Sequence, residues 1–132
     1  MRLSQKLYTL LTAMVDTASQ EAGQTEENDT VSKAMHFIQE QYMNPISLLD
    51  VATHVNMSQF HFFRLFRKDC GYSPHEYLIL TRLNRAKHLL KTTGLPVKVI
   101  AQKVGYQNVS SFTNAFTDRV GISPTLFRKY SI

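Results

Sequence analysis

The chain has 132 residues, of which 43% are hydrophobic, and this length allows one or two small folding units with a packed core. It contains no run of about 18 apolar residues, so no transmembrane helix is predicted, and its single cysteine, Cys70, excludes an internal disulfide and a multi-cysteine zinc site. The net charge of +5 is uneven, since residues 1–30 carry 2 basic and 5 acidic side chains and residues 31–132 carry 13 basic and 5 acidic ones. A basic region of about 100 residues favours a polyanionic partner, with nucleic acid first.

Residues 1–20 are predicted to form an amphipathic helix. Leu3, Leu7, Leu10 and Met14 are spaced by four, three and four residues, which places them on one face. About two heptads are too few to predict a stable coiled coil from pattern alone. The apolar face is therefore expected either to pair with a second copy of the chain, as a homodimer, or to dock on the chain's own domain. Residues 21–30 are polar and acidic without apolar periodicity, which is typical of a linker.

Three helices are predicted over residues 31–73. The first begins after Thr30, runs to about residue 42 and turns a set of apolar side chains inward. These are Ala34, Phe37, Ile38 and Tyr42. After a turn at Asn44-Pro45, Ser47 is placed to cap a short helix with Asp50 three residues on, and Ser58 to cap a helix over residues 59–69.

A long helix is predicted over residues 74–93. Ser73 can cap it, Pro74 suits the first helical position, and Glu76 stands where a capping box requires an acid. Gly94 is expected to end it in the left-handed conformation. Its apolar stripe consists of Ile79, Leu83, Ala86 and Leu90.

Short helices return after this point. Pro96 opens one helix, Gly105 provides a turn, and Asn108 caps a helix that runs to about residue 120. A last helix is predicted over residues 125–130, with Leu126 and Phe127 packed inward.

The two halves are related by an internal repeat. The matching pairs are Val51/Ile100, Ala52/Ala101 and Val55/Val104 at an offset of 49, and Phe62/Phe112, Phe66/Phe116, Gly71/Gly121, Ser73/Ser123 and Pro74/Pro124 at an offset of 50. The change of one residue falls in the turn. Each unit reads as helix, short turn, helix, which is the helix-turn-helix arrangement, and two copies in one basic chain indicate it more strongly than one.

Residues 31–132 resemble the DNA-binding domain of the AraC/XylS transcription regulators. In the second half the resemblance lies in Ile100-Ala101, Val104-Gly105-Tyr106, Phe112, Phe116, Gly121-Ile122-Ser123-Pro124 and Phe127-Arg128-Lys129. In the first half and the long helix it lies in Leu48, Val51-Ala52, Met57-Ser58, Arg64-Leu65-Phe66, Gly71-Tyr72-Ser73-Pro74, Tyr77, Arg82, Ala86 and Leu89-Leu90. Residues 1–18 look more loosely like the helix that often ends the family's regulatory domain, and that domain is absent here.

The resemblance implies an all-α fold. Two three-helix subdomains, each a helix-turn-helix unit, would occupy residues 31–73 and 94–132, with the helix over 74–93 joining them and an extra N-terminal amphipathic helix. In the family, the second helix of each unit enters a major groove. From Pro74 to Thr92 the joining helix would span about 28 Å at 1.5 Å per residue, against about 34 Å between successive major grooves on one DNA face. If both units are held rigidly, the DNA must bend to accept them.

The first predicted recognition helix has an apolar face for the core and a second face for DNA. Arg64 suits a bidentate contact to guanine, and Gln59 suits adenine. Phe60 and Phe63 can meet thymine methyl groups, although packing of either ring on the long helix is the alternative. For Arg64 the alternatives are a phosphate contact or a surface ion pair.

The second predicted recognition helix has weaker chemistry for reading bases. Asn114 occupies the position of Arg64 and suits adenine, and Val109 can touch a thymine methyl. Ser110 and Thr113 suit phosphate or water-mediated contacts. Because this face lacks arginine and has a single amide, we expect it to contribute less direct sequence reading than the first.

Phosphate contacts are expected from helix N-termini and from basic side chains. Many charged side chains on a small domain are simply solvated, so contact with DNA is expected from about half of the basic candidates Lys68, Lys98, Lys103, Arg119, Arg128 and Lys129. The candidates are Ser47, Ser58, His61, Arg67, Lys68, Lys98, Lys103, Asn108, Thr117, Arg119, Arg128 and Lys129.

The sequence contains no Gly-rich phosphate loop, no HExxH and no Gly-x-Ser-x-Gly motif, so no enzyme is predicted. No metal and no cofactor are expected. The predicted function is sequence-specific binding of double-stranded DNA in a cytoplasmic, nucleoid-associated bacterial transcription regulator. The alternative is a protein-interaction module that contacts RNA polymerase or another regulator and whose DNA surface has degenerated.

Overall fold

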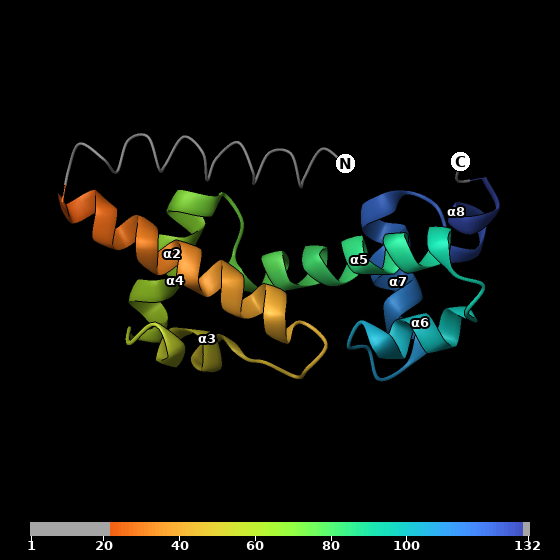
Figure 1. Ribbon diagram of the computed structural model, residues 1–132, viewed down its shortest axis with the longest axis horizontal. Coiled ribbons are helices and arrows are strands. Elements are labelled where there is room, and N and C mark those ends of the chain that lie inside the picture. The colour runs from red at the N-terminus through yellow and green to blue at the C-terminus, as the bar shows by residue number, and fades with distance from the viewer. Residues whose placement is uncertain (1–21, 131–132) are drawn as a thin grey trace. The chain divides into compact units, whose positions relative to one another are not determined.

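The computed structural model describes residues 22–130, which are all-helical and contain seven helices (Figure 1). Their bounds are α2 Ala22–Gln41, α3 Leu48–His54, α4 Gln59–Cys70, α5 Pro74–Thr92, α6 Val97–Lys103, α7 Val109–Val120 and α8 Pro124–Tyr130. This confirms the predicted all-α fold. The helix predicted over residues 1–20, with Leu3, Leu7, Leu10 and Met14, lies outside the described residues. Within the described range, none of the helices is both long and apolar enough to cross a membrane.

The chain divides into two compact units. Among the described residues, the first contains 22–41 and Ile46–Leu78, and the second contains Tyr42–Pro45 and 79–130. The first unit is therefore built from α2, α3, α4 and the start of α5, and the second from the rest of α5 with α6, α7 and α8. The long helix is divided between the units by its packing.

The linker predicted over residues 21–30 is wrong for residues 22–30, which form the first half of α2. Thr30 is consequently inside a helix and does not cap one. Ala, Gln and Glu favour helices and no proline interrupts them, so the acidic composition does not prevent a helix here. The ion pair between Lys33 Nζ and Asp29 Oδ2, at 3.2 Å and four residues apart, joins the two halves of the helix.

The core of the first unit lies between α2, α4 and the start of α5. Its fully buried aromatic side chains, Phe62 and Phe66, have ring centroids 5.5 Å apart, and Tyr77 meets Phe66 edge-on at 5.6 Å. The hydroxyl of Tyr77 accepts a hydrogen bond from Gln39 Nε2 at 2.7 Å. The remaining buried apolar side chains of the unit come from all four helices and include Val31, Ala34, Met35, Ile38, Val51, Ala52, Leu65, Cys70 and Leu78.

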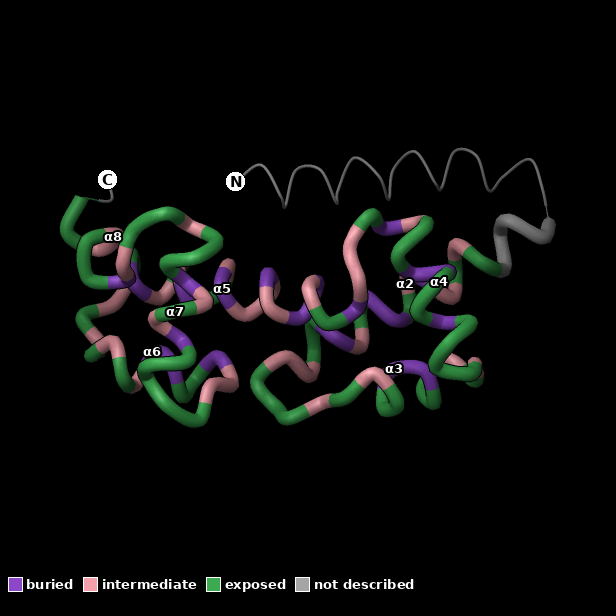
Figure 2. Tube along the Cα trace, turned by 180° about the vertical axis from the view of Figure 1, so that it is seen from behind, coloured by how far each residue is buried: buried purple, intermediate pink, exposed green. Residues whose placement is uncertain are grey.

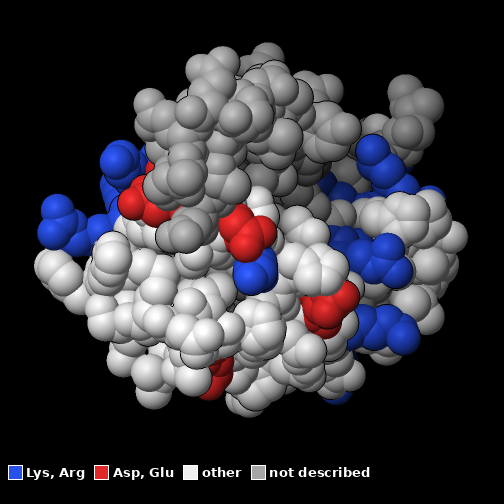
Figure 3. Space-filling view, turned by 60° about the vertical axis from the view of Figure 1, so that its left-hand side comes forward, with Lys and Arg blue, Asp and Glu red and all other residues white. Residues whose placement is uncertain are grey.

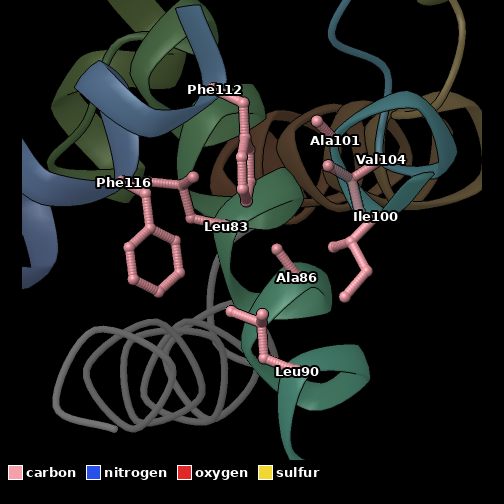
Figure 4. Close-up of a cluster of buried hydrophobic side chains, with 8 residues drawn as sticks. All are labelled: Leu83, Ala86, Leu90, Ile100, Ala101, Val104, Phe112 and Phe116. Carbon is pink, nitrogen blue, oxygen red and sulfur yellow. The ribbon is translucent and has the colours of Figure 1, made fainter. Parts of the chain in front are cut away.

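The core of the second unit repeats this aromatic arrangement. Phe112 and Phe116 are 5.7 Å apart, and Phe127 meets Phe116 edge-on at 5.5 Å. Phe112 and Phe116 belong to a cluster of buried side chains drawn in Figure 4. Its members are Leu83, Ala86, Leu90, Ile100, Ala101, Val104, Phe112 and Phe116. Phe127 packs on this cluster as predicted, but Leu126 is 43% exposed and its predicted packing is wrong. A helix of seven residues can turn only one side inward, and Phe127 with Pro124 occupies that side.

Most predicted helix caps are confirmed. Ser47 and Asp50 form a reciprocal capping box, the hydroxyls of Ser58 and Ser73 accept amides of His61 and Glu76, and Asn108 Oδ1 accepts the amide of Ser111 at 2.8 Å. These bonds satisfy amide groups that the first helical turn would otherwise leave unpaired. The starts of α3, α4, α5 and α7 are thus determined by residues close to them in the sequence.

The predicted left-handed Gly94 is wrong. Among the described glycines, only Gly71, Gly105 and Gly121 have positive φ. The end of α5 is instead satisfied by side chains: Thr93 Oγ1 donates to the carbonyl of Leu89 at 2.6 Å. From α8, Arg128 Nε and Nη2 donate to the carbonyls of Leu90 and Thr93 at 3.1 and 3.2 Å.

Arg82 anchors a turn within the second unit. Its Nε donates to the carbonyl of Tyr42 at 2.7 Å and its Nη2 to the carbonyl of Asn44 at 2.9 Å, while its guanidinium carbon lies 5.5 Å from the ring centroid of Tyr106. Burial lowers the pKa of Arg82 from its usual range. A Cβ at Gly105, where φ is +108°, would lie 2.8 Å from the carbonyl oxygen of Tyr42.

Candidate nucleic-acid interface

The helix-turn-helix of the first unit consists of α3, the turn around Asn56 and α4. Asn56 adopts the left-handed conformation at φ 60°, and the amide of Met57 donates back to the carbonyl of Ala52 at 3.0 Å. An asparagine tolerates this conformation better than most residues. The turn closes tightly enough for Val51 and Ala52 of α3 to be buried with Phe62 of α4.

The outer face of α4 is open to solvent. Phe62, Leu65 and Phe66 are buried, as predicted, and the alternation of buried and exposed positions along the helix can be followed in Figure 2. The exposed residues are Gln59, Phe60, His61, Phe63, Arg64, Arg67 and Lys68. We call this set the α4 face. It brings together all the residues of this helix that the sequence put forward for DNA contact.

Phe60 and Arg64 form a pair on the α4 face. The guanidinium carbon of Arg64 lies 5.6 Å from the centroid of the Phe60 ring, within the range of a cation–π contact. Phe60 is 74% exposed, so its ring is not buried against the long helix. This contact with the ring restricts the positions that the guanidinium can take.

Phe63 has a different environment. It is 37% exposed and lines an apolar cleft of about 140 Å³ with Pro74, His75 and Leu78 at the start of α5. Ile38 and Val51 lie on other walls of the same cleft. The alternative of packing beside the long helix therefore applies in part to Phe63, which stands at the border between the α4 face and the first unit's interior.

Glu27 of α2 also borders the α4 face. It lines a hollow of about 470 Å³ with Phe60, His61, Arg64, Leu65 and Lys68. Sequence reasoning missed this residue because it placed residues 21–30 in a linker. The pKa of Asp69, on the same helix as Arg64, is raised by burial and by the neighbouring charge of Glu27, and lowered by Lys68.

The corresponding surface of the second unit, the α7 face, consists of Val109, Ser110, Thr113, Asn114 and Thr117. Four of these side chains are exposed and Thr113 is half-buried, because it lies closer to the core residues Phe112 and Phe116. The α7 face carries no arginine or lysine between residues 109 and 117. Arg119 follows two residues after Thr117, and its Nη1 lies 3.9 Å from Asp118 Oδ2, at the long limit of an ion pair.

The capping side chains retain hydrogen-bonding capacity after capping. A serine hydroxyl that accepts an amide can still donate its own proton, so Ser47 and Ser58 can donate to a phosphate oxygen while they cap α3 and α4. The amide nitrogen of Asn108 is a donor in the same way. Pro96 caps α6 without a side-chain hydrogen bond and offers no such group.

The basic candidates differ in their environments. Lys68, Lys98, Lys103 and Arg67 are exposed, and Lys129 lies 5.5 Å from the ring centroid of Tyr130. Arg128 uses its Nε and Nη2 in hydrogen bonds to the end of α5, and its phosphate contact stays a prediction. The face shown in Figure 3 mixes acidic and basic side chains and is not uniformly positive.

Other chemistry finds no support in this geometry. Burial raises the pKa of the Cys70 thiol to about 11, so it is a neutral thiol near pH 7 and a poor nucleophile. Within residues 22–130, His, Cys, Asp and Glu do not gather in groups of three that could hold a metal ion.

Comparison with known proteins agrees with this geometry. A family model described as a helix-turn-helix domain matches residues 51–130. The transcriptional activator AarP of Providencia stuartii is 34% identical over 102 residues, which cover 77% of this chain and 76% of AarP. Three other transcription regulators are 29–40% identical, and this chain spans only 29–46% of their lengths.

Two solved structures are also similar. One is the C-terminal domain of AraT, a response regulator from Geobacillus stearothermophilus, with a TM-score of 0.75 and 31% identity over 78% of this chain and 86% of that domain. The other is the DNA-binding domain of AdpA, a global transcriptional factor, solved in complex with a target DNA. It has a TM-score of 0.72 and 25% identity, and the match covers 75% of this chain and 89% of that domain.

Proposed function

We propose that this chain, which belongs to the AraC/XylS family of transcription regulators, binds double-stranded DNA by placing the α4 face and the α7 face in adjacent major grooves. The observation that supports this most is the duplicated frame. Both candidate recognition helices are 12 residues long, begin at a capped residue after a short turn, end at a left-handed glycine and leave one polar face exposed. In a helix-turn-helix, this is the helix that reads base edges.

Arg64 is the principal candidate for base reading. A guanidinium can donate two hydrogen bonds to O6 and N7 of guanine, and its stack on Phe60 reduces the entropy lost when it binds. Gln59 suits adenine on the same face, while Phe60 and Phe63 offer apolar surface for thymine methyl groups. On the α7 face, Asn114 is the counterpart that suits adenine, with Val109 beside a methyl group.

Phosphate contacts would hold both helices in register. Ser47, Ser58 and Asn108 can donate from helix N-termini, where the helix dipole also favours an anion. Exposed Arg67, Lys68, Lys98 and Lys103 can add charge. Each phosphate that such a residue neutralises should contribute about one unit to the salt slope of binding.

The length of α5 fits a two-groove arrangement. Its 19 residues span about 28 Å, compared with about 34 Å between adjacent major grooves on one face of the duplex. A circular-permutation gel assay tests the accompanying bend, and straight DNA would contradict a rigid joint between the two faces.

A second candidate function rests on the apolar surface beside the α4 face. Leu49 is 53% exposed, and the cleft bordered by Phe63 is apolar, which suits a protein partner such as RNA polymerase. The two functions can coexist, because Leu49 and the apolar cleft lie beside the α4 face and a DNA-bound chain could still contact a protein there. If the α4 face served only a protein partner, no DNA sequence would be enriched by this chain.

Site selection from random DNA, followed by footprinting, tests the proposal. We expect an enriched motif with two parts about one helical turn apart. Deletion of residues 1–20, analysed by sedimentation, tests the homodimer predicted through Leu3, Leu7, Leu10 and Met14. An unchanged oligomeric state after the deletion would exclude that homodimer.

A further inference from the structure

An acidic side chain borders the face that we propose reads DNA. Glu27 shares a hollow with Arg64 and Lys68, two of the basic side chains of the α4 face. Glu27 belongs to α2, which packs on α4, and it lies 37 positions before Arg64 in the chain. No comparable contact was expected, because composition alone placed this residue in a solvated linker.

The charge of Glu27 acts on α4. It contributes to the raised pKa of Asp69, so its field reaches the helix that carries Arg64. Arg64 itself is oriented by the Phe60 ring 5.6 Å from its guanidinium carbon, and Phe60 lines the same hollow. Glu27 of α2 and Phe60 of α4 therefore both border the hollow that Arg64 lines.

A neighbouring carboxylate affects the two targets of an arginine differently. A phosphate carries a full negative charge and is repelled by a carboxylate near the arginine. The edge of a guanine is neutral and presents only partial charges at O6 and N7. A carboxylate beside Arg64 therefore weakens capture of phosphate, which any sequence supplies, more than it weakens contact with guanine.

We infer that Glu27 is a specificity-determining residue that disfavours sequence-independent binding by Arg64 and Lys68 and thereby widens the gap between selected and unrelated DNA. The inference rests on the proposed function of the α4 face. It assigns to α2 a part in DNA selection without any contact between α2 and a base.

The test compares two substitutions that remove the same charge from the same helix. Glu27→Gln removes the carboxylate at the hollow. Asp29→Asn is the matched control, because Asp29 is exposed and pairs with Lys33 at 3.2 Å on α2 itself. For each protein, affinity is measured for the selected site and for an unrelated duplex of the same length, at several salt concentrations.

We expect Glu27→Gln to raise affinity for unrelated DNA about threefold at low salt, with a smaller change at the selected site. The ratio of the two affinities should fall, and the effect should shrink as salt is raised. Asp29→Asn should leave the ratio unchanged. In the background of Arg64→Ala, Glu27→Gln should lose most of its effect on the ratio.

Equal effects of Glu27→Gln and Asp29→Asn on the ratio would overturn the inference, since the charge would then act from a distance and not at Arg64. An unchanged or increased ratio for Glu27→Gln would overturn it as well. These outcomes differ from failure of the proposed function, in which the unmodified chain itself shows no preference among sequences. The thermal unfolding temperature of Glu27→Gln should be unchanged or slightly higher, because the repulsion between Glu27 and Asp69 is removed.

Discussion

The two units share a frame but differ in the surface that the frame presents. In both, two fully buried phenylalanines are separated by four residues and a third aromatic ring meets the second one edge-on. Both recognition helices end at a left-handed glycine, with φ of 88° at Gly71 and 95° at Gly121. Outside this frame, the α4 face carries Arg64 where the α7 face carries Asn114. The two units therefore share the residues that position the recognition helix and differ in the residues that this helix exposes.

The frame residues are expected to give the largest effects. Phe116→Ala in the second unit and Phe66→Ala in the first should each cost about 3–5 kcal/mol, because both side chains are fully buried and their removal leaves a cavity. Denaturant unfolding monitored by circular dichroism measures this. If the units are as equivalent as their cores suggest, the two losses should agree within about 1 kcal/mol, and a much smaller loss at either site would break the equivalence.

Substitutions in the helix-turn-helix turns of the two units, at Gly105 and Asn56, are expected to have the next largest effects on stability. Gly105→Ala should destabilise the second unit by about 2–3 kcal/mol, because alanine is strained at φ +108° and its Cβ would meet the Tyr42 carbonyl and Arg82. Asn56→Gly, at the equivalent turn of the first unit, is the control and should change stability by less than about 1 kcal/mol. Equal losses would mean that the crowding at Arg82 is unimportant.

The two reading faces should differ in DNA binding. Arg64→Ala should cost about 1–3 kcal/mol at the selected site and relax the preference at one base pair, whereas Asn114→Ala should cost less, because a neutral amide makes weaker contacts than a guanidinium. Arg85→Ala, at an exposed position of α5, controls for loss of positive charge. Titration by fluorescence anisotropy gives the affinities, and a larger cost at Asn114 would reverse the order of the faces.

The caps should give the smallest effects. Ser58→Ala and Asn108→Ala each remove a side-chain acceptor from an exposed helix start, at a cost of about 1 kcal/mol in the free energy of unfolding. Thermal unfolding of the two variants provides the comparison. Ser58→Asp should restore stability while introducing charge where phosphate is proposed, so a variant with normal stability and weakened DNA binding would locate that contact.

Features determined by nearby residues could be predicted from the sequence. The caps at Ser47, Ser58 and Asn108, the ends at Gly71 and Gly121, and the inward face of Phe62 and Phe66 all depend on residues a few positions apart. The exposed composition of both reading faces followed from the same periodicity. Base contacts could be proposed on this basis, and they remain predictions.

Features determined by distant residues could not be predicted. Gly94 needs no left-handed conformation because Arg128, 35 positions beyond Thr93, donates to the end of α5. The first part of α2 could not be predicted because its polar and acidic residues lack apolar periodicity, although they are helical. The position of Glu27 next to α4 was missed for the same reason. In the sequence, Arg82 was only one of the residues that carry the family resemblance, whereas its position is set by the carbonyls of Asn44 and Tyr42, 38 and 40 positions earlier.

The bonds from Arg128 to the carbonyls of Leu90 and Thr93 have a practical consequence for the smallest piece of this protein that can be studied alone. Seven residues of α8 look dispensable by length, yet they supply both the partner for the end of α5 and the ring of Phe127 over Phe116. A fragment that stops at Gly121 would expose that ring surface to water and leave those carbonyls without their donor. Fragments should therefore include all of α8, and fusions or tags should be attached after Tyr130. Loss of stability would then report proteolytic removal of α8.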